Sequence, residues 1–95
     1  MKLIGYDIRM YKMSSVYVVI ENGIPYETVY VTFASAKTAV KEKYASEIAE
    51  QRKESGTCSD IDTLEDIVTA KTYMYVEKGI HIYIYKLPIF RANTL

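Results

Sequence analysis

Two side chains of this chain could form a nucleophile–base pair, because the sequence holds one cysteine, Cys58, and one histidine, His81. A thiol becomes a nucleophile when a base or a positive charge favours its thiolate. Cys58 is followed by Asp60 and Asp62 instead, and their negative charge disfavours the thiolate. The sequence therefore favours an incidental cysteine, and we expect a protein that is not an enzyme.

The acidic segment 60–66 could hold a hard cation. A calcium loop needs alternating oxygen ligands, a glycine at its turn and a terminal glutamate. The segment has a D-x-D pattern without a following glycine, whereas Asp62 and Glu65 have the spacing of a capping box. We expect these acids to cap a short helical turn that includes Leu64, Ile67 and Val68. With one histidine and one cysteine, we expect no zinc site and no cofactor.

The segment 72–86 holds the strongest candidate binding residues. Its sequence, TYMYVEKGIHIYIYK, alternates tyrosine with aliphatic residues on both sides of a glycine. Period two is typical of β-strands, so the segment predicts a hairpin with two chemically different faces. The aliphatic face would carry Met74, Val76, Ile80, Ile82 and Ile84. The aromatic face, which we take as the binding site, would carry Tyr73, Tyr75, His81, Tyr83 and Tyr85.

The register of this hairpin follows from the uniformity of its two faces. A two-residue loop would place aliphatic residues opposite tyrosines, whereas a three-residue loop at 77–79 pairs Tyr73 with Tyr83. The longer loop also places Gly79 where a type I turn followed by a bulge needs a positive φ. We therefore expect the three-residue loop.

The aromatic face could have several occupants. Tyrosines on a sheet can stack nucleic-acid bases, but Lys71, Lys78 and Lys86 are the only flanking cations, and twelve basic residues balance twelve acidic ones. Tyrosine is also enriched in protein interfaces, which favours a protein partner over a nucleic acid. Residues 87–95 contain Pro88 and are expected to leave the sheet. They could cover the face instead, and both alternatives stay open. His81 could be a pH-sensitive contact, although an amphipathic filler is favoured.

Three strands are expected ahead of this hairpin, at residues 4–10, 15–21 and 28–33. Asn22-Gly23 is a strong hairpin signal, and Pro25 places the following pairing at an edge or makes it loose. In the second strand one face would carry Val16, Val18 and Ile20. In the third strand the inward residues would be Val29, Val31 and Phe33.

The hydrophobic period changes to that of a helix after Ser35, which is a good N-cap. Residues 36–55 contain no glycine or proline, and Gly56 is a natural stop. The apolar stripe would carry Ala36, Val40, Tyr44 and Ile48. The predicted order is β-β-β-α-β-β, an α+β fold in which one long amphipathic helix covers one face of an antiparallel sheet of about five strands.

Length and composition narrow the class of protein further. A chain of 95 residues that is 49% hydrophobic predicts a single α+β domain over residues 1–95. We expect no membrane span and no signal peptide, and the unpaired cysteine suits a reducing compartment, so the predicted location is the cytoplasm. The formal net charge of zero leaves little repulsion between copies, which favours a homo-oligomer, namely a dimer.

The segment VYVVIENGIPYETVYVTFASAKTAV resembles the opening of small uncharacterised α+β proteins from phages and their bacterial hosts. The matching residues are Tyr17, Val18, Val19, Gly23, Phe33, Ser35 and Ala39. The pattern is a hairpin that leads into an N-capped helix, and it carries no catalytic residues. The resemblance implies a phage-encoded accessory or inhibitor protein that binds a host or defence component.

Two hypotheses of function therefore come from the sequence. The first is a small non-enzymatic module that binds a protein partner. The alternative is a small-ligand or nucleotide binder that uses the tyrosine-rich face.

Overall fold

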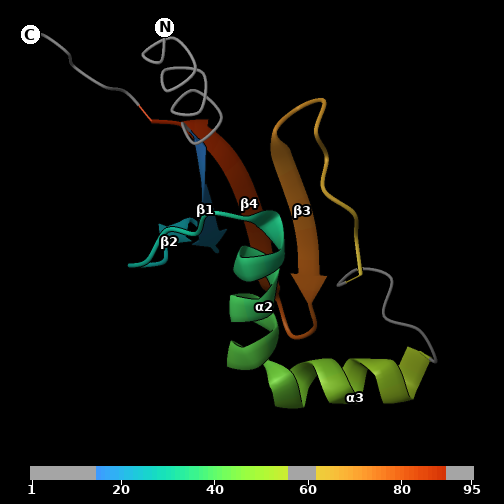
Figure 1. Ribbon diagram of the computed structural model, residues 1–95. Coiled ribbons are helices and arrows are strands. Elements are labelled where there is room, and N and C mark those ends of the chain that lie inside the picture. The colour runs from blue at the N-terminus through green and yellow to red at the C-terminus, as the bar shows by residue number, and fades with distance from the viewer. Residues whose placement is uncertain (1–14, 56–61, 90–95) are drawn as a thin grey trace, which may run out of the picture.

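The computed structural model describes residues 15–55 and 62–89 of the chain. Its elements are β1 (Ser15–Glu21), β2 (Ile24–Pro25), α2 (Phe33–Lys43), α3 (Ala45–Ser55), β3 (Lys71–Val76) and β4 (Ile80–Pro88) (Figure 1). The four strands form an antiparallel sheet in the order β2-β1-β4-β3. The predicted α+β class is confirmed, but the described residues form four strands and two helices, not five strands and one long helix. The expected strand at residues 4–10 lies outside the described residues.

The pairing of β1 with β4 joins two strands that are more than fifty residues apart in the sequence. It runs from Ser15 opposite Pro88 to Glu21 opposite Ile82, the whole length of β1. The sheet therefore joins the N-terminal hairpin to the C-terminal one through its two central strands. Residues 87 and 88 belong to β4, so the prediction that the chain leaves the sheet at residue 87 is wrong.

Both predicted turns form, and the second hairpin has the expected register. Asn22 and Gly23 have φ values of 49° and 85°, as a two-residue turn of mirror-image type requires. In the second hairpin Tyr73 pairs with Tyr83, which confirms the three-residue loop. Gly79 has the expected positive φ, but Lys78 does as well, at 75°, so the turn is not the predicted type I turn with a bulge.

The predicted strand at residues 28–33 is replaced by an irregular segment along the edge of β1. The Tyr26 amide donates to the Val19 carbonyl at 2.8 Å, and Tyr30 forms an isolated bridge with Tyr17. Tyr30 lies four residues after Tyr26, whereas Tyr17 lies two residues before Val19. The segment therefore bulges between the two contacts, as expected for loose pairing next to Pro25.

This bulge changes the faces of the residues that were expected to point inward. Val29 is 54% exposed and Val31 is 72% exposed. Phe33 does pack against the core, but it does so as the first residue of α2. The inward placement of the two valines was therefore wrong.

The helical region begins earlier than predicted and is broken in the middle. Thr32 is the N-cap, and its side-chain oxygen accepts the Ser35 amide at 3.0 Å, so Ser35 lies inside the first turn. At Tyr44 the backbone leaves the helical region, with φ −116° and ψ 34°. The Tyr44 amide still donates to Val40. Beyond Tyr44 the chain continues as α3, which runs in a different direction from α2 (Figure 1).

The length of the sheet explains this break, because no glycine or proline lies there. A straight helix of 23 residues would be roughly 35 Å long, whereas β1 and β4, the strands on which α2 packs, span roughly 23 and 30 Å. The last turns of a straight helix would therefore extend beyond these strands. The turn at Tyr44 instead buries Ile48 to 6% exposure, and α3 contacts β3.

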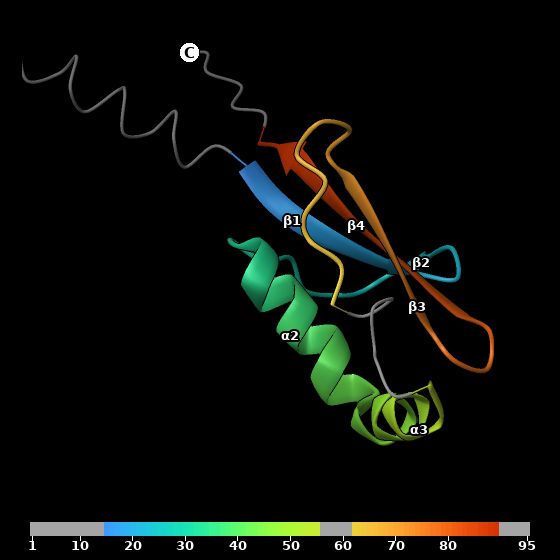
Figure 2. The same cartoon turned by 90° about the vertical axis from the view of Figure 1, so that its right-hand side faces the viewer.

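Both helices lie on the same side of the sheet, and the core lies between the two layers (Figure 2). Its buried residues are Tyr17, Val19, Ala36, Val40, Ile48, Met74, Val76, Ile82 and Ile84. The predicted aliphatic face of the C-terminal hairpin therefore does face the helices. No helix among the described residues is long and apolar enough to cross a membrane.

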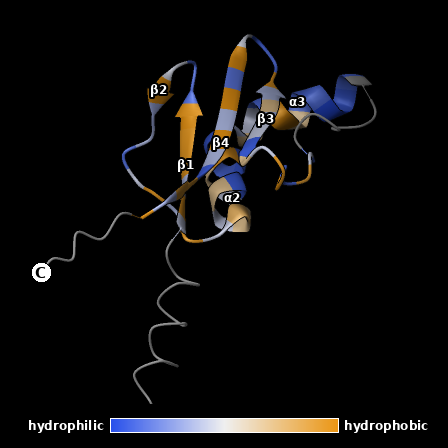
Figure 3. Cartoon of the chain, turned by 90° about the horizontal axis from the view of Figure 1, so that it is seen from above, coloured by the Kyte–Doolittle hydropathy of each residue, from blue (hydrophilic) through white to orange (hydrophobic). Residues whose placement is uncertain are grey.

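In β1 the buried face is formed by Tyr17 and Val19, which alternate with the other aliphatic residues. Figure 3 shows β1 coloured as hydrophobic along most of its length and β4 in alternating bands. The sequence pattern grouped Val16, Val18 and Ile20 correctly on one face. The structure places that face on the side away from the helices.

Gln51 of α3 occupies part of the free edge of β3. Its side-chain nitrogen donates to the Tyr75 carbonyl at 3.3 Å, and its oxygen accepts the Glu77 amide at 3.1 Å. The amide side chain thus takes the place of a neighbouring strand at this point of the edge.

We expect Ile82→Val to lower the free energy of unfolding by about 0.5–1.5 kcal/mol, because Ile82 is fully buried and loses a methylene group. The matched change Ile67→Val, at a position 77% exposed, should alter it by less than about 0.5 kcal/mol. Urea unfolding of both variants measures the difference. Equal effects would contradict the described core.

We expect Gln51→Ala to speed amide hydrogen exchange at Glu77 by about tenfold or more, because that amide loses its acceptor. The Tyr26 amide, which donates to the Val19 carbonyl, serves as the internal control. NMR-detected exchange resolves the two positions. An unchanged rate at Glu77 would show that Gln51 does not hold this edge.

Candidate functional site

The side of the sheet turned away from α2 and α3 brings together all five predicted site residues. We call it the open face and define it by its strand residues. These are Val16, Val18 and Ile20 of β1, Lys71, Tyr73 and Tyr75 of β3, and His81, Tyr83, Tyr85 and Leu87 of β4.

Strand register explains why these residues share a side, since directly paired residues of antiparallel strands point to the same face. Tyr83 is paired with Tyr73 on one side and with Ile20 on the other. Tyr85 likewise lies between Lys71 and Val18. Two rows of side chains therefore cross the three long strands without interruption.

The rings on the open face contact one another. The Tyr83 ring centroid lies 5.1 Å from that of Tyr73 and 6.2 Å from that of Tyr85, with the ring planes tilted by 47° and 45°. The Lys71 ammonium lies 4.9 Å from the Tyr83 centroid and 5.7 Å from the Tyr85 centroid. Both distances are within the range of cation–π contacts.

His81 is held at the end of this cluster by its backbone and its side chain. Its Nδ1 lies 2.7 Å from the Tyr73 hydroxyl, and its ring centroid lies 5.2 Å from that of Tyr75. Its amide donates to the Asn22 side-chain oxygen at 2.8 Å. The Tyr75 hydroxyl in turn accepts the Gly79 amide at 3.1 Å. The polar groups of the cluster are thus fixed by the two hairpin turns.

No described segment covers the open face. Tyr73 and Leu87 are each 42% exposed, and the remaining tyrosines are half-buried. Residues 87 and 88, which could have folded over the face, are part of β4 instead. Residues 90–95 lie outside the described residues.

Sequence reasoning missed the contribution of β1 to this site. The alternation in β1 was visible, but which of its faces joins the tyrosines depends on the pairing with β4. No local signal reports that pairing, because the two strands are more than fifty residues apart in the sequence.

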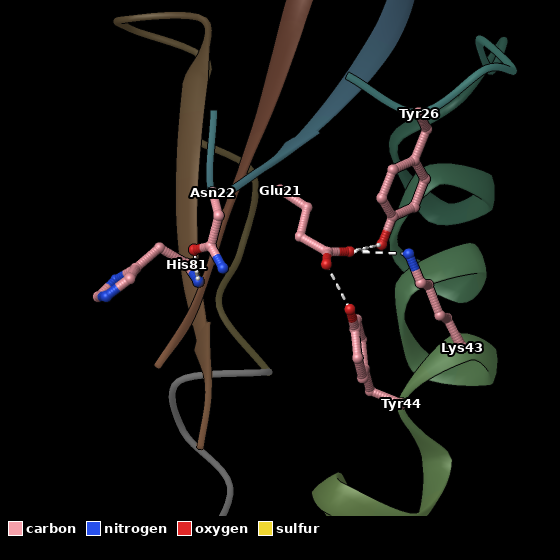
Figure 4. Close-up of polar contacts among 6 residues, drawn as sticks. All are labelled: Glu21, Asn22, Tyr26, Lys43, Tyr44 and His81. Carbon is pink, nitrogen blue, oxygen red and sulfur yellow. Dashed lines mark hydrogen bonds and ion pairs between the residues drawn. The ribbon is translucent and has the colours of Figure 1, made fainter. Parts of the chain in front are cut away.

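A second polar site lies where β1 ends, and sequence reasoning did not find it (Figure 4). The Glu21 carboxylate accepts hydrogen bonds from the Tyr26 hydroxyl at 3.0 Å, from the Lys43 ammonium at 3.0 Å and from the Tyr44 hydroxyl. Lys43 also lies 4.7 Å from the Tyr26 ring centroid. This Glu21 cluster ties the end of β1 to the break between the helices.

The pKa values in this cluster favour an ionised Glu21 beside a protonated Lys43. Burial would raise the pKa of Glu21, but the hydrogen bonds from Tyr44, Lys43 and Tyr26 outweigh burial and hold that pKa below its ordinary value. The hydrogen bond to Glu21 raises the pKa of Lys43. Burial, and then the hydrogen bond to Glu21, raises the pKa of Tyr26 and of Tyr44. The tyrosines are therefore neutral donors to a carboxylate.

A shallow hollow with a volume of about 580 Å³ adjoins this cluster. It is lined by Glu21, Asn22, Ile24, Pro25, Tyr26, Glu27, Thr28, Tyr30 and Lys43. Its size is within the range of small-molecule sites, and two tyrosines contribute to its wall.

The acidic segment has structural contacts, as far as it is described. Asp62 lies 3.7 Å from Lys41 and 3.6 Å from Arg52, and the Glu65 carboxylate accepts the Tyr17 hydroxyl at 2.8 Å. Asp60 and Cys58 lie outside the described residues. Within the described ranges, no group of histidine, cysteine and acidic residues has the geometry of a metal site.

Asp66, rather than Asp62, caps the turn that follows. Its carboxylate accepts hydrogen bonds from the amides of Val68 and Thr69, both at 3.1 Å. These hydrogen bonds, those from Thr69 most of all, lower the pKa of Asp66. The aliphatic residues expected to pack in this turn are exposed instead, namely Leu64, Ile67 and Val68. The predicted capping by Asp62 and Glu65 is therefore wrong, and among the described residues of this segment a carboxylate caps a turn only at Asp66.

No family model matches the chain, and neither a curated protein nor a solved structure matches it.

We expect Glu21→Gln to lower the free energy of unfolding at pH 7 by about 1 kcal/mol, because a charged acceptor of three hydrogen bonds is lost while Lys43 stays half exposed. Since the pKa of Glu21 is lower in the folded chain, its carboxylate stabilises the fold above its ordinary pKa of 4.5. This contribution is lost as the pH falls through the folded value.

The difference between wild type and Glu21→Gln should therefore be largest above about pH 5 and should shrink in more acidic solution. Urea unfolding over this pH range measures it, with the exposed Glu50→Gln in α3 as the matched control. A difference that does not depend on pH would contradict the charged Glu21 cluster.

Proposed function

We propose that this protein is a small non-enzymatic module that binds another protein through its open face. The observation that carries the proposal is the composition of that face. Tyrosine and aliphatic side chains continue across three strands, and among the described strand residues on this side only Lys71 has a permanent charge. A contiguous apolar face of this kind is typical of protein interaction sites.

The contacts within the face support binding at low entropic cost. Tyr83 packs against two neighbouring rings, and the hydroxyls of Tyr73 and Tyr75 are held by His81 and Gly79. Side chains that are already ordered lose little rotamer freedom when a partner binds. The partner would present an apolar surface with few charges at its centre.

A protein partner fits these features better than a nucleic acid. Bases stack on aromatic planes that lie open to them, whereas Tyr75, Tyr83 and Tyr85 are half-buried. A nucleic-acid backbone also calls for several cations, and Lys71 already lies over two rings. The resemblance to small phage and bacterial proteins supports an accessory or inhibitor role against a host or defence component.

The hollow beside the Glu21 cluster favours a second candidate function, the binding of a small ligand. Its volume of about 580 Å³ and its tyrosine wall suit a small planar molecule. This candidate uses the β1–β2 side of the molecule and the side chain of Tyr30, not the open face.

Two matched tyrosine variants distinguish the two candidates. Tyr83→Ser changes the open face and Tyr30→Ser changes the hollow, and both tyrosines are half-buried. We expect the wild type and Tyr30→Ser to retain the same protein from a lysate of the source cells. Tyr83→Ser should weaken its binding by about tenfold or more, since aromatic residues dominate interface energies.

Quantitative pull-down measures this loss, far-UV circular dichroism confirms that the variants fold, and native mass spectrometry of the purified protein detects any retained small molecule. Equal retention of the partner by Tyr83→Ser would overturn the proposed function. A small molecule bound by the wild type and lost from Tyr30→Ser would favour the second candidate.

A further inference from the structure

We propose that the open face also binds the open face of a second copy of this chain, which gives a symmetric dimer with the two sheets inside and the helices outside. The proposal rests on the proposed function, because it uses the same surface. It goes further by naming one additional partner, a second copy of the chain, since each copy presents the apolar, weakly charged surface that the open face requires.

The distribution of charge allows two copies to meet. Each open face brings one permanent charge among its described strand residues, that of Lys71. Its ammonium lies over the Tyr83 ring in the single copy, but Lys71 is an exposed residue of the edge strand β3, so a change of rotamer would let the ammonium reach solvent when a second copy packs on the face. The chain has no net charge, so no long-range repulsion opposes association.

The geometry of the face suits sheet-on-sheet packing. The face is built from regular antiparallel pairs, with half-buried Val18 and Ile20 beside the tyrosines of β4. Two such sheets pack about 10 Å apart with their side chains interdigitated. A two-fold axis between them would pair the same patch on both copies.

The available area predicts a weak dimer. The strands β1, β3 and β4 have seven, six and nine residues, and with strands about 4.8 Å apart and residues about 3.3 Å apart they give a face of roughly 330 Å² in projection. Two copies would remove about twice that area, roughly 660 Å², from water, and more once the relief of the side chains is counted. The projected total is below the roughly 1,000 Å² of a stable specific interface, so we expect a transient dimer that dissociates at about 100 μM.

The edges of the sheet are less suitable for self-association. Gln51 already bonds to the backbone of Tyr75 and Glu77 at the β3 edge. At the other edge β2 has two residues, and the bulged segment follows it. The open face is therefore the surface on which a second copy fits best.

Two valine variants test this dimer with the full chain. Val18→Lys places a charge in the middle of the open face, and Val68→Lys makes the same change in a loop, at a position 90% exposed. We measure solution mass by light scattering and sedimentation between about 5 and 500 μM protein. The wild type and Val68→Lys should rise from the monomer mass of 10.9 kDa towards twice that mass. Val18→Lys should raise the dissociation constant about tenfold or more.

Tyrosine nitration on the wild type gives an independent readout and does not depend on the folding of Val18→Lys. Tyr83 and Tyr85 should become protected as the concentration rises, whereas Tyr30, which is outside the open face, should not. If Val18→Lys loses its circular dichroism signal, this protection decides the question.

Four results would overturn the dimer. They are a wild type that stays monomeric at 500 μM, equal dimerisation of all three proteins, protection of Tyr83 in the monomer, and co-purified nucleic acid that binds the face. The third result would mean that a segment of the same chain covers the face. A monomeric wild type whose Tyr83→Ser variant still loses its protein partner would leave the proposed function intact, so the two failures are distinguishable.

Discussion

The pairing of β1 with β4 is the constraint on which the rest of this structure depends. It joins two hairpins that are distant in the sequence, and the two paired strands are the central strands of the sheet. Because side chains alternate along a strand, this one register also decides both faces at once. It sets Val19 opposite Ile84 in the core and Val18 opposite Tyr85 on the open face. A shift of β1 by one residue would turn Tyr17 and Val19 towards the open face and Val18 and Ile20 towards the helices.

The Glu21 cluster explains how the helices are held against this sheet. Glu21 is the last residue of β1, and its carboxylate binds the side chains of Lys43 and Tyr44 at the break between α2 and α3. The helix can then turn and bury Ile48, and Gln51 reaches the edge of β3. A polar contact at the end of one strand thus helps to position a helix over another strand. The open face takes no part in this network, so its composition is not needed to hold the helices.

Local patterns in the sequence predicted the elements well, and the failures have physical causes. The Asn-Gly pair predicted the turn at residues 22 and 23. The requirement that each face of the hairpin be chemically uniform predicted that Tyr73 pairs with Tyr83. The break at Tyr44 could not be predicted, because it arises from the length of the sheet and from contacts with Glu21. The bulge after Pro25 interrupts the strand predicted at residues 28–33, so the alternation in that segment did not predict which side chains are buried. In the candidate site, the five hairpin residues were found, whereas the β1 residues depend on long-range pairing.

The contribution of β1 changes how the tyrosines should be interpreted. A lone hairpin with four tyrosines could be a cross-strand ladder that stabilises itself by about 0.2–1 kcal/mol per pair. In the sheet, the same tyrosines continue into Val18 and Ile20, which gain nothing from facing water. A protein that needed the face merely to stabilise the hairpin could carry polar residues at those positions of β1. Aliphatic residues there are useful when another apolar surface covers them, and this supports the proposal that the whole face, and not the tyrosine ladder alone, binds a partner.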